Sequence, residues 1–192
     1  MATGCRIPCK YFVTSGVGQS SADTGSDHYE TSCYDIALLD AGIENFNVMM
    51  YTSVLPPESE EISIEEAKRE ALFHHGAVLE TIKAQIDGVQ GDHLCAGVGR
   101  CWVKKKQGDG SWKTIGGFAA EYEGHASIEK ASKILEADLR GIFERRYGHQ
   151  PEYRLEPSFK TSVREMVVDE DFGTCFVALC FVTFEYPEAP MP

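Results

Sequence analysis

Long hydrophobic runs are missing from this sequence of 192 residues. The best apolar stretch, residues 176–184, suits a buried strand, because a membrane-spanning helix needs roughly 20 apolar residues. The first six residues lead into neither a long apolar run nor a small-residue cleavage site, so no signal peptide is expected. These features predict a soluble, cytoplasmic protein without a membrane partner.

Positive charge is also scarce. Lysine and arginine together number 18 against 30 aspartate and glutamate residues, which gives a formal net charge of −12. A nucleic-acid partner would need a basic face, so none is expected. A negative field raises the local concentration of cationic small molecules, although the same charge also fits simple solubility.

The sequence has seven cysteines but no C-x-x-C pair. They are Cys5, Cys9, Cys33, Cys95, Cys101, Cys175 and Cys180. An odd, scattered set indicates free thiols in a reducing compartment rather than a zinc site or a disulfide framework. His74 and His75 are adjacent and cannot share one helix face, so no metal site is predicted.

Helix and strand patterns alternate along one domain that comprises residues 1–192, with no internal repeat. Strands are predicted for residues 10–15, 77–86, 94–105, 112–123, 153–168 and 175–185. Helices are predicted for residues 31–41, 63–73 and 127–147. The glycines of the turn at 108–110 favour a hairpin between 94–105 and 112–123, and 77–86 is expected to pair with 94–105. The pattern predicts an α+β fold with mainly antiparallel sheets and amphipathic helices outside them.

Local signals mark the ends of two helices and one turn. Thr31 or Ser32 is expected to cap the first helix, and Gly42 is expected just after its end. Ser127 is predicted to cap the last helix, which Gly148 ends. The Ser-Gly-Val-Gly segment at 15–18 predicts a tight turn or a close backbone approach.

Residues 47–57 form the most unusual run. Strand-forming residues end on Thr52 and Ser53, and Pro56 and Pro57 then fix the exit direction because each proline locks φ. The Thr52–Ser53 bond is therefore expected at a stiff strand end. Such a site favours an N-to-O acyl shift, although most Thr-Ser pairs are solvated turn starters or local hydrogen-bonding residues.

Two carboxylates are candidates for a site. Strand alternation places Glu121 and Glu123 on one face and Tyr122 on the other. Asp35 and Leu38 are three residues apart, which puts a carboxylate beside an apolar wall on one helix face, an arrangement that suits an arginine side chain. An ordinary solvated acid is the alternative reading for each carboxylate.

Four segments occur in a fixed order, namely KYFVTSGVG, YDIALLDAGI, NVMMYTSVLPP and AEYEG. Together they resemble the pyruvoyl-dependent arginine decarboxylases, most specifically at TSVLPP. The resemblance covers most of the chain. In that family the bond that is cut is usually Ser-Ser, whereas here it would be Thr52–Ser53, and threonine keeps the hydroxyl group.

The resemblance implies a four-layer αββα sandwich that assembles as a homotrimer with sites between subunits. Cleavage would yield a β chain of residues 1–52 and an α chain of residues 53–192, and Ser53 would become a covalent pyruvoyl cofactor, with no metal. L-Arginine would form a Schiff base with this group, lose carbon dioxide and leave as agmatine. Acid tolerance or arginine consumption would be plausible roles.

The resemblance also implies roles for individual residues. Glu121 would donate a proton, Asp35 would bind the guanidinium group with Leu38 along the stem, and Asn47 would support processing or the site. Two alternatives stay open. The chain can be a pyruvoyl-dependent decarboxylase of another amino acid, or a non-cleaving binding or structural relative.

Overall fold

Two five-stranded sheets form the centre of the computed structural model, which describes residues 5–21, 29–70 and 72–186. The first sheet has the strand order β3-β6-β11-β2-β5. Its strands are β2 (Lys10–Ser20), β3 (Asn47–Met50), β5 (Glu60–Glu61), β6 (Val78–Val89) and β11 (Phe172–Phe181). The second sheet has the order β10-β7-β8-β4, with β9 beside β7. Its strands are β4 (Val54–Leu55), β7 (His93–Lys106), β8 (Trp112–Gly124), β9 (Tyr153–Leu155) and β10 (Lys160–Val167).

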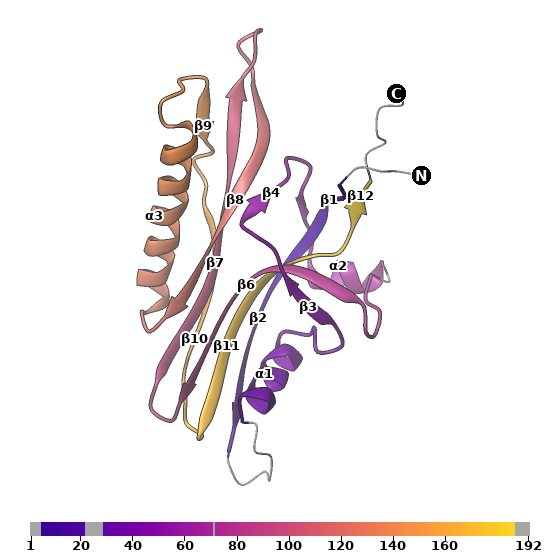
Figure 1. Cartoon of the computed structure of the whole chain (residues 1–192), viewed down its shortest axis with the longest axis vertical. Coiled ribbons are helices and arrows are strands. Elements are labelled where there is room, and N and C mark those ends of the chain that lie inside the picture. The colour runs from indigo at the N-terminus through magenta and orange to yellow at the C-terminus, as the bar shows by residue number, and fades with distance from the viewer. Residues whose placement is uncertain (1–4, 22–28, 71, 187–192) are drawn as a thin grey trace.

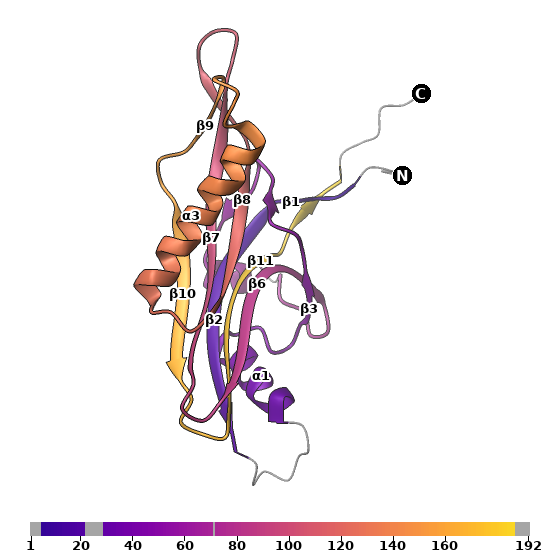
Figure 2. The same ribbon diagram turned by 60° about the vertical axis from the view of Figure 1, so that its left-hand side comes forward.

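Helices cover the outer faces of both sheets (Figures 1 and 2). α1 (Tyr29–Asp40) and α2 (Ile64–Arg69) pack on the first sheet, and α3 (Ile128–Tyr147) packs on the second. A small sheet of β1 (Ile7–Pro8) and β12 (Phe184–Glu185) lies near the described ends of the chain. Most pairings are antiparallel, and among the strands of the described residues only β3 and β5 join their neighbours in parallel. The predicted αββα sandwich is confirmed.

The core depends on β11, the apolar run that the sequence marked as a buried strand. Val177 and Leu179 face the second sheet, whereas Phe176 and Ala178 face the α1 layer, and all four side chains are fully buried. This two-sided burial makes β11 the central strand of its sheet, between β2 and β6. The predicted pairing of residues 77–86 with 94–105 is therefore wrong, because β6 pairs with β11 and β3 while β7 belongs to the other sheet.

Helix α1 lies directly on β2 at two glycines. A Cβ atom at Gly16 would clash with the carbonyl oxygen of Ala37, and one at Gly18 would clash with that of Cys33. The predicted close backbone approach is thus confirmed. The alternative of a tight turn is wrong, because β2 continues through both glycines to Ser20.

The helix ends only partly follow the sequence signals. α1 begins at Tyr29, so Thr31 and Ser32 lie within it and do not cap it; residues before Tyr29 lie outside the described part of the chain. Gly42 ends α1 as predicted, with a φ of 71°. This is the left-handed backbone that favours glycine. The backbone N–H of Gly42 donates a 3.0 Å hydrogen bond to the carbonyl oxygen of Leu39.

The helix predicted for residues 63–73 is shorter, since α2 ends at Arg69. The last helix follows its prediction closely. The Ser127 side chain accepts a 3.4 Å hydrogen bond from the backbone N–H of Lys130, and Gly148 ends α3 with a right-handed φ of −58°.

An ion pair between buried Arg100 and partly exposed Glu61 links β5 to the second sheet. The guanidinium group of Arg100, a residue that is 4% exposed, donates a 2.5 Å hydrogen bond to Glu61, and Lys160 donates to the other Glu61 oxygen at 2.8 Å. Burial would raise the pKa of Glu61, but the hydrogen bonds and charges of Lys160 and Arg100 outweigh it and hold this pKa below its ordinary value. The segment after Pro57 is therefore fixed between the sheets.

We expect Glu61→Gln to lower the free energy of unfolding at pH 7 by about 2–3 kcal/mol, since it leaves a buried guanidinium group without its counter-charge. A carboxyl group whose pKa is lower in the folded state stabilises the protein above its unfolded pKa, and this stabilisation is lost as pH falls through the folded value. The gap between the parent protein and the variant should thus shrink below about pH 4. Urea titrations at several pH values measure this stability difference, and Glu60→Gln, a change at an exposed residue, is the control. Equal stabilities for Glu61→Gln and the parent protein at pH 7 would contradict a stabilising role for the ion pair.

Candidate functional site

The chain crosses from one sheet to the other at Ser53. β3 ends at Met50 and β4 begins at Val54 in the second sheet. The N–H of Tyr51 donates to the carbonyl oxygen of Thr81 at 2.7 Å, and the N–H of Ala119 donates to that of Ser53 at 3.2 Å. The Thr52–Ser53 bond is therefore not at the strand end that the sequence predicted. It lies in a bend two residues later, fixed on both sides by different sheets.

A three-residue turn is centred on Ser53. The backbone N–H of Val54 donates a 2.9 Å hydrogen bond to the carbonyl oxygen of Thr52, which is the i to i+2 pattern of a γ-turn. Thr52 is exposed and Ser53 is half-buried. The carbonyl group before Ser53 thus already has a donor that would stabilise negative charge on its oxygen.

The Ser53 hydroxyl group donates a 2.7 Å hydrogen bond to Oε1 of Glu121, a residue 68 positions later in the chain. A carboxylate at this distance can accept the hydroxyl proton and make the oxygen a better nucleophile. Tyr122 points to the other side of β8, where its hydroxyl oxygen accepts a hydrogen bond from the N–H of Ala126. The predicted alternation along β8 is confirmed.

An acidic cavity of about 450 Å³ adjoins this pair. The residues that line this acidic cavity are Met50, Tyr51, Lys83, Glu121 and Glu123. Lys83 was not singled out by the sequence analysis. Burial lowers the pKa of Lys83, while the charges of Glu123 and Asp87 oppose the shift.

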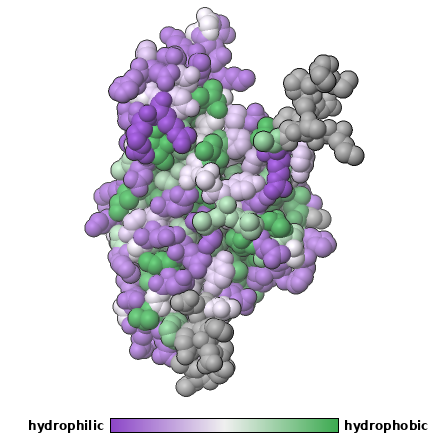
Figure 3. All heavy atoms as spheres, viewed as in Figure 1, coloured by the Kyte–Doolittle hydropathy of each residue, from purple (hydrophilic) through white to green (hydrophobic). Residues whose placement is uncertain are grey.

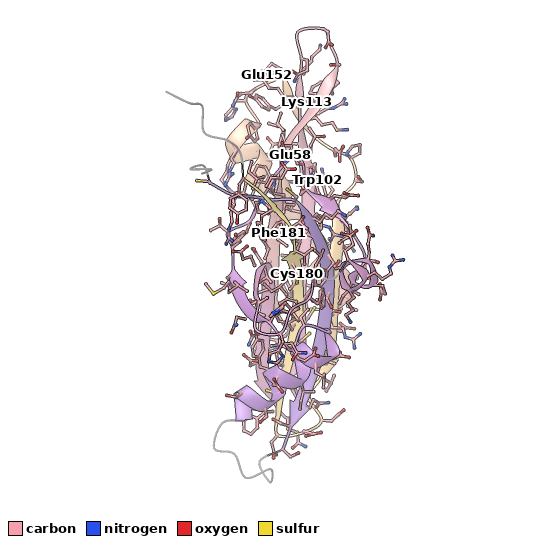
Figure 4. All side chains as sticks on the ribbon, turned by 90° about the vertical axis from the view of Figure 1, so that its right-hand side faces the viewer. Glu58, Trp102, Lys113, Glu152, Cys180 and Phe181 are labelled. Atoms are coloured by element: carbon pink, nitrogen blue, oxygen red, sulfur yellow. The ribbon has the colours of Figure 1, made fainter. Side chains whose placement is uncertain are left out.

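A larger cavity of about 780 Å³ lies along the same segment, and we call it the guanidinium cavity. Its charged members are Arg6, Glu58 and Arg146. The exposed Thr52 side chain also lines it. In Figure 4, Glu58 lies between Lys113 on the β7–β8 hairpin and Phe181 in the core. Two guanidinium groups therefore line the same cavity as Thr52.

The other predicted site residues are elsewhere in the single chain. Asn47 opens β3, and its side-chain amide donates a 2.9 Å hydrogen bond to the carbonyl oxygen of Gly76. Asp35 is exposed on α1, whereas Leu38 is 7% exposed and packs beneath that helix. Figure 1 places α1 and β4 on opposite sides of β3. The structure thus brings together Thr52, Ser53 and Glu121 but not the other three residues, and the roles of all six stay predictions.

The described part of the chain holds no cluster of three metal-ligating side chains and no helix long and apolar enough to cross a membrane. The seven cysteines are free thiols, and five of them are buried. Burial raises the pKa of Cys101 and Cys175 to about 11, so these thiols stay protonated at neutral pH.

Comparisons with known proteins converge on one family. A family model described as pyruvoyl-dependent arginine decarboxylase matches residues 10–186. The chain is 37% identical to the pyruvoyl-dependent arginine decarboxylase AaxB of Chlamydia muridarum, over 96% of each chain. It is 36% identical to AaxB of Chlamydia pneumoniae, over 98% of this chain and 97% of that protein. Pyruvoyl-dependent arginine decarboxylase 1 of Archaeoglobus fulgidus is 27% identical, over 92% of this chain and 99% of that protein.

Proposed function

The chain belongs to the pyruvoyl-dependent arginine decarboxylase family, and from this premise we propose that it cleaves itself between Thr52 and Ser53 and then converts L-arginine to agmatine and carbon dioxide. The single observation that carries the proposal is the 2.7 Å hydrogen bond from the Ser53 hydroxyl group to Glu121. It joins a nucleophile to a base next to the bond that would break.

The cleavage begins as Glu121 accepts the hydroxyl proton and Ser53 Oγ attacks the carbonyl carbon of Thr52. The N–H of Val54, 2.9 Å from the carbonyl oxygen, stabilises the negative charge that develops there. The carbon–nitrogen bond then breaks, the nitrogen of Ser53 takes a proton, and an ester replaces the peptide bond. Loss of the Cα proton of Ser53 expels the Thr52 carboxylate and leaves dehydroalanine. Water converts this group to a ketone and releases ammonia.

The residues at Ser53 fit the pyruvoyl group that would result. The carbonyl group of Ser53 would persist beside the new ketone, and its oxygen accepts a 3.2 Å hydrogen bond from the N–H of Ala119. A pyruvoyl ketone supplies an electrophile for an amine and a sink for the electron pair left when carbon dioxide departs. The Ala119 N–H orients the adjoining carbonyl group and stabilises charge on its oxygen.

Glu121 changes its role after cleavage, because the hydroxyl group to which it was bonded no longer exists. Its carboxyl group then faces the acidic cavity and is positioned to deliver a proton to the substrate Cα. The carboxylates of Glu121 and Glu123 attract a cationic substrate. Asn47 would support processing or the site from the start of β3.

Asp35 would contact arginine from a neighbouring subunit of a homotrimer, and Leu38, which packs beneath α1, would line the stem only through its small exposed part. Support comes from their separation from Ser53 and from four exposed apolar residues on β3, β4 and the start of β6. These are Met49, Met50, Val54 and Val78, each more than half exposed. Figure 3 shows hydrophobic residues near the middle of the face on which Figure 1 labels β3. A neighbouring subunit would cover them, since large exposed apolar patches mark interaction sites.

The reaction consumes a proton, so acid tolerance or arginine consumption in the cytoplasm is the proposed role. A net charge of −12 supports a small cationic substrate over a nucleic-acid partner.

Intact mass under denaturing conditions tests the cleavage. The purified protein should give two fragments that meet at Ser53, the larger one with a blocked N-terminus that reacts with hydrazine. Ser53→Ala should give a single full-length chain because the nucleophile is absent, while Thr52→Ser should split as the parent protein does. A full-length, unreactive parent chain would leave the non-cleaving alternative as the better account.

Glu121→Gln tests the proton donor. We expect it to fold normally, to split more slowly and to lose about 10²-fold or more in kcat per hydrazine-reactive chain, because an amide cannot deliver the proton. Glu123→Gln, two positions along the same face of β8, is the matched comparison: it should raise KM, because a carboxylate that attracts the substrate is lost, but keep most of kcat. Normal turnover in Glu121→Gln would remove this residue from the role. Assays with ornithine, lysine and histidine beside arginine test which amino acid is the substrate. Turnover of one of these three without turnover of arginine would favour a pyruvoyl-dependent decarboxylase of another amino acid.

Co-expression tests the shared site. Asp35→Asn and Ser53→Ala should each be inactive alone, yet mixed trimers should recover part of the activity. In a mixed trimer, a subunit with an intact Ser53 can meet an intact Asp35 from its neighbour. Matched mixtures of Asp35→Asn with the double variant Asp35→Asn/Ser53→Ala should stay inactive, and failure of the first mixture despite proven mixed trimers would place both residues in one chain.

A further inference from the structure

The proposed cleavage creates a charge that the intact chain does not have, the α-carboxylate of Thr52. We propose that this carboxylate binds the guanidinium group of Arg146 in the guanidinium cavity, so that the cavity is a built site for the new chain end. The inference rests on the proposed function, and it concerns an anion-binding site of this chain rather than the substrate site.

Strand register brings Arg146 to the cleavage point. Val54, the second residue after Thr52, lies directly opposite Phe118 in the antiparallel pair of β4 and β8. The guanidinium carbon of Arg146 lies 4.8 Å from the centre of the Phe118 ring. Thr52 and Arg146 also line the same cavity. The guanidinium group is therefore held over the residue that pairs with the start of the new α chain.

Arg146 is the cation that is available there. Arg6, the other guanidinium group of the cavity, forms an ion pair with the buried carboxylate of Glu80. Arg146 has no carboxylate partner among the residues that the structure describes. Arginine is suited to the task because its planar group binds a carboxylate through two parallel hydrogen bonds.

The acidic cavity is the alternative destination, and its charge argues against it. Glu121 and Glu123 line it against a single cation, Lys83. Burial disfavours the charged form of Lys83. A third carboxylate there would meet repulsion from both acids. The guanidinium cavity has one acid, Glu58, and its two cations are Arg146 and the Arg6 that Glu80 already binds, so an added anion would meet less repulsion there.

The released end has little chain with which to move. The N–H of Tyr51 is bonded to Thr81, and the Tyr51 ring lies 6.0 Å from that of Phe181, so this residue stays anchored. Only Thr52 is freed by cleavage, and one residue spans at most about 3.6 Å. The carboxylate thus stays near Ser53, and binding to Arg146 would keep its negative charge away from the acids and from the substrate carboxylate.

Carbon-13 at the carbonyl position of threonine makes the new end visible. In the mature protein only Thr52 among the threonines would carry a free carboxylate, so a single labelled carboxylate resonance should appear and titrate with pH. Its midpoint should lie about half a pH unit or more below that of Arg146→Gln, because a guanidinium group close by favours the charged form while solvent and salt weaken the effect. Arg146→Lys should keep part of the shift.

Arg145→Gln, an exposed change in the same helical turn, is the control and should leave the midpoint where it is. Equal midpoints in the parent protein and Arg146→Gln would overturn the proposal, and a change on Lys83→Met instead would place the end in the acidic cavity. If acid unfolds the protein before the titration ends, a crystal structure of the mature protein decides, since the proposal requires hydrogen bonds between Thr52 and Arg146. Absence of any threonine carboxylate resonance would mean that cleavage fails, which is a separate outcome.

Discussion

The site depends on the hydrogen bond between Ser53 and Glu121, and that bond depends on strand register. β4 is only two residues long, yet it fixes Val54 opposite Phe118 on β8. This register places the Ser53 hydroxyl group within hydrogen-bond distance of Glu121, three residues beyond Phe118 on the same strand. Because side chains alternate along a strand, a slip of one residue would turn Glu121 to the α3 side. The pairing of β7 with β8, which runs along nearly the whole of both strands, prevents such a slip. A large part of the second sheet therefore fixes one 2.7 Å contact.

Charge is distributed unevenly around this contact. The acidic cavity and the guanidinium cavity share Met50 and Tyr51, so opposite fields meet across a few residues of chain. In a protein with a net charge of −12, the positive charge is local and comes mainly from Arg146 in the last turn of α3, because Arg6 is paired with Glu80. A cationic substrate would be attracted to the acidic cavity, and the anionic chain end that the proposed cleavage creates would be attracted to the guanidinium cavity. Residues on either side of Ser53 would therefore keep the substrate and the Thr52 carboxylate in different cavities by charge.

Local signals predicted the layers, whereas contacts between distant residues were not readable from the sequence. Gly42, Ser127 and the alternation along β8 act within a few residues, and each behaved as expected. The predicted pairing of β6 with β7 was wrong because β6 instead pairs along its length with β11, which is distant in the sequence. The motif TSVLPP pointed to Ser53, but only the fold shows Glu121 at its hydroxyl group. Lys83 and Arg146 lack a local signature, since their importance comes from the cavities that they line.

The position of β2 has a consequence for the life of the molecule. This strand precedes the proposed cleavage point and lies inside the first sheet, between β11 and β5. The N-terminal fragment would therefore share a sheet with the larger fragment. Before cleavage, refolding is a first-order process within one chain. After the proposed cleavage two separate polypeptides would have to meet, so recovery from denaturation would become second order and sensitive to dilution. Cleavage would thus make unfolding, which is reversible in the intact chain, hard to reverse at low protein concentration.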